Sequence, residues 1–300
     1  MLQKFDPRNE DIQIWVGDRL WPRNEAKVSV FDSVVQGGDG VWEGLRIYEE
    51  GVFSLDKHLD RLYDSAHTLA FEGIPDREWV KDCIFKTLEA NGMRKDTHIR
   101  LTLSRGTKIT SGMDPRLNQA GCCLIIVAEW KPPVYDKSGI TLCTSSILRN
   151  SPRHLDSKIH HNNLLNNILA KIEANLAGTD DALMLDTNGF VAEANATNVF
   201  MIRGGRLYTP FADACLPGIT RGLILDIARD MGIHSEERNL SVSEFYNADE
   251  VFVTGTMGEL ARVTEIDGRA IRNRTDDSVL DQLQDAFAKY VRANCLPLPF

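Results

Sequence analysis

The first half of the chain mixes two spacings of apolar residues. Four segments alternate apolar and polar residues or form short apolar runs, which predicts strands: 27–31, 44–55, 97–106 and 121–130. Within the second of them, Glu49-Glu50-Gly51 predicts a tight hairpin. Two other segments, 55–71 and 78–93, repeat apolar residues every three or four positions, which predicts helices.

In the second half, a strand is predicted over 140–148. The apolar residues from Ile159 to Leu176 then follow helical spacing up to Gly178, a natural helix end. This pattern predicts a helix that begins directly after Lys158 and buries one apolar stripe. Further along we expect a helix over 220–232 and short strands at 182–186, 198–202, 206–210, 250–255 and 261–271.

These elements predict an α+β fold, because strands and helices alternate without a regular βαβ rhythm. The segment 130–139, WKPPVYDKSG, combines two prolines with charged residues and a glycine, which is typical of a linker. We therefore expect a small N-terminal domain over 1–129, a linker over 130–139 and a larger C-terminal domain over 140–300.

Composition narrows the class of protein. The 300 residues are 43% hydrophobic and 26% charged, as in an ordinary globular protein. A net charge of −9 argues against a nucleic-acid partner, since such proteins usually carry a basic stripe. The six cysteines form no CxxC pair, and no apolar run approaches the roughly 18 residues that a membrane helix needs. We expect a cytoplasmic protein that binds neither nucleic acid nor a membrane.

Lys158 is the first candidate for chemistry. The partial positive charge at a helix start disfavours a cation, so a lysine there is suited to act as a neutral nucleophile or to form a Schiff base. The alternative is a surface lysine in a frayed first turn. His160 and His161 are adjacent and point in different directions on a helix, so we expect no metal site. They are either donors near the lysine or residues that start the helix.

Two glycine-containing segments suit a phosphate group. Gly218 precedes Ile219, Thr220 and a predicted helix, whose first N–H groups can bind an anion. Thr256 lies in VTGTMGE, residues 253–259, where hydroxyls and bare backbone come together. An ordinary capped helix is the alternative for the first segment. Neither segment has the spacing of a P-loop, which favours a small phosphorylated cofactor over a nucleotide.

Glu193 lies in a turn of small residues before an apolar strand. Its side chain is either a solvated carboxylate or the partner that keeps a heteroaromatic ring nitrogen protonated. A lysine, this glutamate and two phosphate-type turns together describe a pyridoxal-phosphate site.

Six segments, in order, resemble those of the class IV, or fold-type IV, pyridoxal-phosphate aminotransferases: DGVWEGLRIY, HLDRLYDSA, KIHHNNLLNNILAKIEA, VAEANATNVF, LPGITRG and ADEVFVTGTMGEL. That family includes branched-chain and D-amino-acid aminotransferases and 4-amino-4-deoxychorismate lyases. The resemblance implies a small N-terminal α/β sandwich and a larger, β-barrel-like C-terminal domain with helices, as in D-amino-acid aminotransferase. It also implies a homodimer, or a higher homo-oligomer, in which the partner's loop closes the pocket.

The resemblance also assigns cofactor contacts. Lys158 would join covalently to pyridoxal 5′-phosphate and move protons, and Glu193 would pair with the pyridine nitrogen. The residues implied to bind the phosphate are Arg61, Ile219, Thr220 and Thr256. Asn163 stands where many members have a tyrosine that bonds to the cofactor's phenolic oxygen. An amide can still donate to that oxygen but cannot ionise.

The implied substrate contacts lie in several motifs. Arg46 and Arg100 match positions that receive the distal carboxylate of glutamate, for which an arginine fork is well suited. Gly37 and Trp42 replace a tyrosine and a phenylalanine of branched-chain enzymes, which reshapes the pocket. The remaining implied substrate contacts are Thr256 and Met257.

The expected activity is ping-pong transamination between an L-amino acid, branched-chain by default, and 2-oxoglutarate or glutamate. Thr110 and Gly112 replace the arginine and histidine that D-amino-acid members carry, which favours the L-enantiomer. The alternatives are a D-amino-acid aminotransferase or an aminodeoxychorismate lyase of the same fold, and, more distantly, a non-catalytic relative that binds the cofactor.

Overall fold

The computed structural model describes residues 3–135, 138–272 and 277–300. Part of the predicted linker, residues 136–137, therefore lies outside the described residues. The chain divides into two compact units. Of the described residues, the N-terminal unit contains 3–132, 159–163 and 292–300, and the C-terminal unit contains 133–135, 138–158, 164–272 and 277–291.

This division differs from the expected domains at two short segments. The expectation assigned all of 140–300 to one domain. In the structure, Ile159 packs against the core of the N-terminal unit, and Cys295 pairs with Phe53 in its sheet. Packing and strand pairing over a long sequence separation thus place residues that no local pattern could place.

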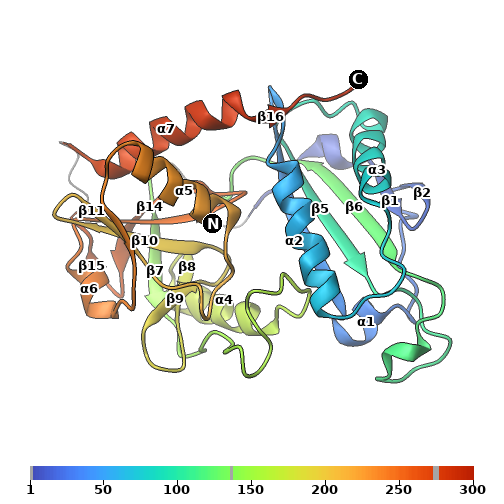
Figure 1. Ribbon diagram of the computed structural model, residues 1–300, viewed down its shortest axis with the longest axis horizontal. Coiled ribbons are helices and arrows are strands. Elements are labelled where there is room, and N and C mark those ends of the chain that lie inside the picture. Colours follow the sequence, from blue (N-terminus) through green and yellow to red (C-terminus); the bar gives the residue numbers. More distant parts are fainter. Residues whose placement is uncertain (1–2, 136–137, 273–276) are drawn as a thin grey trace. The chain divides into compact units, whose positions relative to one another are not determined.

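The N-terminal unit is built on an antiparallel sheet of seven strands (Figure 1). In sheet order they are β16 (Cys295–Leu296), β4 (Gly51–Phe53), β3 (Gly40–Tyr48), β5 (Thr97–Ser104), β6 (Cys123–Trp130), β1 (Gln13–Val16) and β2 (Arg19–Pro22). The predicted hairpin joins β3 to β4 through paired Tyr48 and Gly51. The strand predicted over 27–31 is wrong: these residues form no strand, and the first hairpin is β1–β2.

Helices pack on this sheet and bury its apolar side. They are α1 (Ser33–Gly37), α2 (Leu55–Thr68) and α3 (Arg77–Ala90), with short 3₁₀ helices at Pro7–Asn9 and Pro115–Leu117. α2 packs on β3, and α3 packs on β1 and β6. The helical repeat of α2 buries Leu55, Leu59 and Leu62, and each buried leucine contributes about 2 kcal/mol.

The C-terminal unit is built on a mixed sheet of nine strands. Eight follow the order β12 (Ser235–Glu237), β11 (Arg206–Thr209), β10 (Asn198–Arg203), β13 (Glu250–Gly255), β14 (Glu259–Ile266), β7 (Ile140–Thr144), β8 (Asp181–Leu185) and β9 (Val191–Ala194), and β15 (Arg269–Ala270) pairs with β14. The terminal strand β9 also contacts β10, so the sheet curls on itself. The rings of Phe200 on β10 and Phe252 on β13 are fully buried and stack with their centroids 5.0 Å apart.

Four helices accompany this sheet: α4 (Leu165–Ala177), α5 (Ile219–Asp230), α6 (Val242–Tyr246) and α7 (Val279–Ala293). α4 packs on β7 and β8, and α5 packs on β12 and β13. The side of α4 that faces the sheet buries only Ala170 and Ala174.

The prediction for α4 is wrong in two respects. The helix begins at Leu165 instead of directly after Lys158. Its apolar stripe is also not the buried face, since Leu165 is 67% exposed and Leu176 is 85% exposed. The stripe, which we call the α4 apolar face, consists of Leu165, Ile168, Leu169, Ile172 and Leu176. Apolar patches of this kind usually mark an interaction surface.

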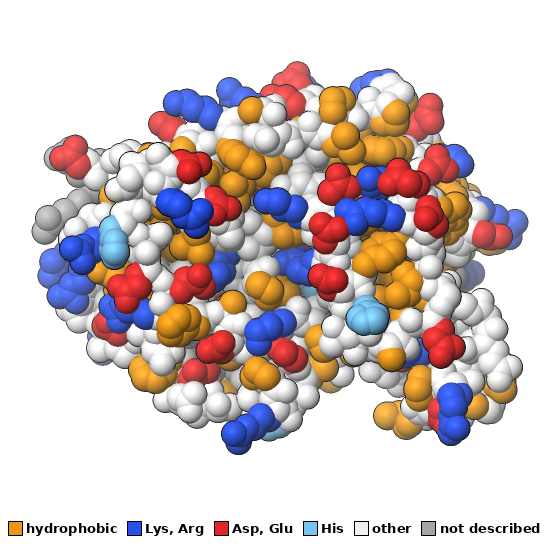
Figure 2. All heavy atoms as spheres, viewed as in Figure 1, with side chains coloured by type: hydrophobic (Ala, Val, Ile, Leu, Met, Phe, Trp, Pro, Cys, Tyr) orange, Lys and Arg blue, Asp and Glu red, His pale blue; other side chains and the backbone are white. Residues whose placement is uncertain are grey.

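On the face shown in Figure 2, acidic and basic side chains are interspersed with apolar ones. Over the described residues, no helix is long and apolar enough to span a membrane. All six cysteines are free thiols. In the same part of the chain, no three histidine, cysteine or acidic side chains gather as metal ligands would.

Candidate active site

Lys158 lies in a turn between β7 and α4, and its side chain is 43% exposed. Its backbone N–H donates to Asp156 Oδ1 at 3.0 Å. The amine is held loosely: Nζ lies 3.6 Å from Asp156 Oδ1 and 3.4 Å from the carbonyl oxygen of Asp213. Since α4 begins only at Leu165, the amine does not lie at a helix start and the predicted effect of a helix dipole is wrong, but the amine remains accessible for chemistry.

The predicted helix does not form over Ile159–Asn163 because the backbone there pairs with β3. The N–H of Asn162 donates to Gly40 O at 2.8 Å, and Trp42 N–H donates to His160 O at 2.9 Å. His161 forms a bridge with Val41. These tertiary hydrogen bonds replace the local bonds of a helix.

Glu193 is a buried residue of β9, so the solvated-carboxylate alternative is wrong. Arg149 Nε donates to its Oε1 at 2.7 Å, and Asn198 Nδ2 donates to its Oε2 at 3.1 Å. Burial raises the pKa of Glu193 above its ordinary value, against the opposing charge and hydrogen bond of Arg149. The fold thus buries the carboxyl group of Glu193 and places the guanidinium of Arg149 and the amide of Asn198 against it.

The first turn of α5 has no capping side chain from the described residues. Gly218, the N-cap, is required for packing, because a Cβ there would lie 2.0 Å from Asn198 Oδ1. The same Asn198 amide donates to Leu216 O at 2.9 Å and to Glu193. The ordinary capped helix is therefore not what the structure contains. The N–H groups of Ile219 and Thr220 begin a helix suited to an anion.

The turn after β13 carries Thr256 and Met257. Just before it, the buried hydroxyl of Thr254 has no hydrogen-bond partner among the described residues. Thr254 pairs with Asn198 across β10 and β13, which places this hydroxyl beside the residue that holds Glu193. The turn packs closely, since a Cβ on Gly258 would lie 2.5 Å from the ring of Tyr135.

The charges of several of these groups act on the pKa of one buried thiol, that of Cys215. The pKa of Cys215 is raised to about 12, first by burial and then by the charge of Glu193. Arg221, Arg149 and Lys158 act in the opposite direction on the same thiol. Lys158 and Glu193, both in the C-terminal unit, therefore lie close enough to Cys215 for their charges to act on its thiol.

In the N-terminal unit, the side of β3 and β5 that faces away from α2 is cationic. Arg100 lies over the ring of Trp42, with its Cζ 3.3 Å from the ring centroid. Burial lowers the pKa of Arg100 to about 10. Arg46 and His98 are direct partners across the two strands. Burial, followed by nearby cations, lowers the pKa of His98 to about 3, so this ring is neutral. Two guanidinium groups therefore share one side of the sheet.

Arg61 lies on α2, on the other side of β3, where Glu43 holds it. Arg61 Nε lies 2.7 Å from Glu43 Oε1, and Nη2 lies 2.8 Å from Oε2. His58 Nδ1 lies 2.7 Å from Oε2 of the same carboxylate. Burial alone would raise the pKa of Glu43, but its charged and hydrogen-bonding partners hold it well below the usual range. Arg61 is thus fixed in orientation by a buried anion.

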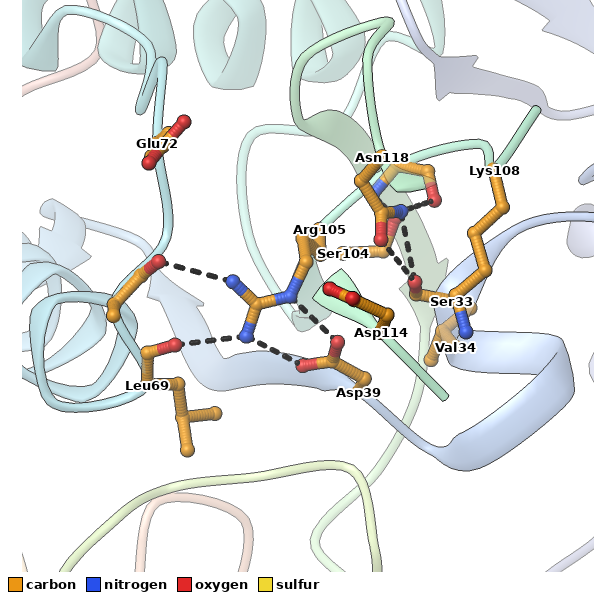
Figure 3. A network of polar contacts seen from close by, with 12 residues as sticks. Ser33, Val34, Asp39, Leu69, Glu72, Ser104, Arg105, Lys108, Asp114 and Asn118 are labelled. Carbon is orange, nitrogen blue, oxygen red and sulfur yellow. Dashed lines mark hydrogen bonds and ion pairs between the residues drawn. The ribbon is translucent and has the colours of Figure 1, made fainter. Parts of the chain in front are cut away.

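The loop between β5 and β6 is fixed by polar contacts with residues in and just after α1, which Figure 3 shows. Arg105 Nε donates to Asp39 Oδ2 at 2.6 Å, and Asn118 Nδ2 donates to Ser33 Oγ at 2.8 Å. In the same loop, Met113 is 92% exposed and Ile109 is 63% exposed. The loop is therefore an ordered arm with an apolar tip.

The family model described as amino-transferase class IV matches residues 40–266. The chain belongs to the class IV aminotransferases. This confirms the family to which the six motifs pointed.

Relatives of this class IV aminotransferase agree with that placement. Branched-chain-amino-acid aminotransferase-like protein 2 of Arabidopsis thaliana is 58% identical over 98% of this chain and 53% of its own length. The chain thus spans about half the length of that curated relative. The putative branched-chain-amino-acid aminotransferase of Methanocaldococcus jannaschii is 39% identical over 92% of this chain and 95% of its own.

The fold is confirmed by solved structures. The branched-chain aminotransferase of Thermoproteus uzoniensis, solved with norvaline, is 29% identical and superposes with a TM-score of 0.87 over 95% of this chain and 96% of its own. A T.th. branched-chain amino acid aminotransferase, solved in complex with N-(5′-phosphopyridoxyl)-L-glutamate, is 34% identical and also has a TM-score of 0.87, over 95% of both chains. The two-domain α+β architecture expected for a class IV aminotransferase is therefore the observed one.

The residues predicted for the site of this class IV aminotransferase are divided between the two units. Lys158, Glu193, Ile219, Thr220, Thr256 and Met257 belong to the C-terminal unit, and Gly37, Trp42, Arg46, Arg61, Arg100 and Asn163 to the N-terminal unit. Asn163 packs against Gly38: a Cβ added to Gly38 would lie 3.5 Å from the Cβ of Asn163. Gly37 is the last residue of α1.

Sequence reasoning missed the residues that support the site. These are Glu43, His58, Arg149 and Asn198. Glu43 did carry a signal, because it occupies a position on β3 whose alternate neighbours Val41, Leu45 and Ile47 are all apolar and buried. A carboxylate in that series requires buried partners.

Proposed function

We propose that this class IV aminotransferase is a cytoplasmic enzyme that binds pyridoxal 5′-phosphate and transfers an amino group between an L-amino acid and 2-oxoglutarate. The observation that carries the proposal is the buried carboxylate of Glu193, which Arg149 and Asn198 hold in place. The accessible amine of Lys158 lies near enough for both residues to influence the same thiol, that of Cys215. The T.th. relative was solved with a phosphopyridoxyl-glutamate adduct.

The donor set of the C-terminal unit fits this cofactor. A buried carboxylate suits a protonated pyridine nitrogen, and the start of α5, which no side chain caps, suits a phosphate. The Thr254 hydroxyl has no hydrogen-bond partner among the described residues, so it can still bond to a ligand. When bound, pyridoxal phosphate supplies an electron-withdrawing ring that stabilises negative charge on the substrate Cα.

The residues have distinct roles in this proposal. Glu193 keeps the ring nitrogen protonated. Ile219 and Thr220 bind the phosphate through backbone N–H groups, with Thr256 and Arg61 as further donors. Asn163 donates its amide to the phenolic oxygen.

Lys158 has two tasks. Its amine would hold the cofactor through the aldehyde, and it would move a proton to or from the substrate Cα. The loose contacts of Nζ with Asp156 and Asp213 suit a group that must exchange between these tasks.

For the substrate, we propose that Arg46 and Arg100 receive the distal carboxylate of glutamate or 2-oxoglutarate. Their shared side of the sheet is cationic, and the neutral His98 adds no charge to it. Trp42, Gly37, Thr256 and Met257 would contact the rest of the substrate. Branched-chain amino acids are the default partners because the named relatives carry that activity in their names.

We also propose that the enzyme is a homodimer or a higher homo-oligomer. The support is the α4 apolar face, whose residues are about half exposed or more, and the separate apolar tip of the arm at Ile109 and Met113. Exposed apolar patches on ordered elements are the usual material of subunit interfaces.

The test of function is a half-reaction screen. Single L- and D-amino acids are added to the cofactor-loaded protein, and the visible absorbance of the bound cofactor is followed. We expect L-glutamate and at least one branched-chain L-amino acid to bleach it. Bleaching by D-alanine alone would instead favour a D-amino-acid aminotransferase, and pyruvate release from aminodeoxychorismate without an oxo acid would favour the lyase. If added cofactor produces the absorbance band but no amino acid bleaches it, the protein is a non-catalytic relative that binds the cofactor.

A further inference from the structure

The five residues that follow Lys158 are bound to one edge of β3. Strand β4 pairs only with the last residues of β3, Ile47 and Tyr48, so the N-terminal half of that edge is left to Ile159–Asn163. Besides the two backbone bonds to Gly40 and Trp42, the indole Nε1 of Trp42 donates to His161 O at 3.1 Å. The chain therefore leaves Lys158 directly into a segment fixed on a strand.

His160 fixes this segment through its side chain as well. Its Nδ1 lies 2.9 Å from Glu43 Oε1, and its backbone N–H donates to Ser65 Oγ at 3.1 Å. Its ring packs on Trp42, with centroids 4.1 Å apart. The charged groups that face the imidazole are Glu43 from β3, Arg61 from α2 and Arg100 from β5.

Glu43 is shared between His160 and Arg61 at the level of single atoms. Oε1 accepts from both Arg61 Nε and His160 Nδ1, whereas Oε2 accepts from Arg61 Nη2 and His58 Nδ1. The carboxylate is fully buried, so water cannot replace a lost donor. Moving His160 would therefore remove a hydrogen bond from Oε1, the oxygen that also accepts from Arg61 Nε.

We propose that His160 is a positioning residue for the transamination: its hydrogen bond to Glu43 fixes the segment that continues from Lys158 and balances the anion that orients Arg61. This inference rests on the proposed function of Lys158 and Arg61. Neither His160 nor Glu43 touches the reacting atoms in this proposal.

The chain offers a matched control. His58 donates to the same carboxylate through the same ring nitrogen and is at least as well buried, but it lies on α2, away from the Lys158 segment. Replacing either histidine by leucine removes one donor from Glu43. Only the replacement at His160 also removes a side-chain hydrogen bond from the segment that continues from Lys158.

The experiment compares the holoproteins of His160→Leu, His160→Asn and His58→Leu with wild type. The readouts are the midpoint of the pH titration of the cofactor's visible absorbance and the dissociation constant of pyridoxal phosphate. We expect His160→Leu to shift the midpoint by about half a pH unit or more and to weaken binding about three- to tenfold. His160→Asn, whose amide can donate to Glu43, should restore both. His58→Leu should weaken binding but leave the midpoint at the wild-type value.

The proposal is overturned if both leucine variants move the midpoint equally, if neither moves it, or if His160→Asn behaves like His160→Leu. Should His160→Leu not fold, His160→Gln takes its place, because its amide lies too far along the side chain to reproduce Nδ1. If wild-type protein itself gains no visible absorbance with the cofactor, the proposed function fails, which is a different outcome from a normal wild type with unchanged variants.

Discussion

At the scale of single residues, the amide of Asn198 joins Glu193 to the start of α5. A methyl group at Gly218 would lie 2.0 Å from Asn198 Oδ1, so Gly218→Ala must displace the amide and remove a donor from Glu193. We expect Gly218→Ala to cost about 1–3 kcal/mol of stability and to weaken pyridoxal-phosphate binding about tenfold. Thermal unfolding and a cofactor titration measure these effects.

The control for this substitution lies in the same helix. A Cβ on Gly222 would meet nothing within 4 Å, so Gly222→Ala should stabilise α5 by about 0.5–1 kcal/mol and leave cofactor binding unchanged. Equal losses in the two variants would show that Gly218 has no particular link to the site.

Glu193 gives a second prediction at this scale. Glu193→Gln keeps the shape of the side chain but removes the charge that would hold a ring nitrogen protonated. The loss of one charge-assisted hydrogen bond predicts a kcat lower by about 10- to 100-fold. Steady-state kinetics with saturating cofactor measure it, and Glu236→Gln, at an exposed position of β12, is the control. A Glu193→Gln enzyme with wild-type kcat would contradict the assigned role.

At the scale of elements, local periodicity predicted most helices and strands but placed α4 wrongly. Helical spacing from Ile159 onward could not reveal that Ile159–Asn163 bond to β3, because that pairing joins residues more than a hundred positions apart. The spacing also could not say which face of α4 is buried. The same limit applies to the predicted site: Lys158 and Glu193 lie in motifs, but the partners of Glu193, Arg149 and Asn198, come from the segment after β7 and from β10.

The cluster on β3 and α2 predicts a pH dependence. Burial lowers the pKa of His160 from 6.5 to about 4, so the fold favours the neutral imidazole. The stability that depends on this neutral ring is present above pH 6.5 and is lost as the pH falls toward 4, by at most about 3 kcal/mol. The thermal midpoint of His160→Leu should therefore fall less steeply than that of wild type between pH 6.5 and 4. Parallel profiles would contradict this prediction.

At the scale of the whole molecule, the α4 apolar face predicts self-association. Ile172→Glu places a charge in the middle of that face, and a charge buried at an interface without a partner is costly. We expect at least about a tenfold weaker dimer, measured by light scattering or sedimentation over a range of concentrations. Ala177→Glu, an exposed position outside the α4 apolar face, is the control. A monomeric wild type would contradict the proposed assembly.

The proposed activity depends most on a covalent bond between Lys158 and the cofactor aldehyde. The direct measurement is reduction of the cofactor-loaded protein with borohydride, which makes that bond permanent, followed by peptide mass spectrometry. We expect a phosphopyridoxyl group on the peptide that contains Lys158 and none on the Lys158→Ala protein. A label on another lysine, or no label on the wild-type protein, would contradict it.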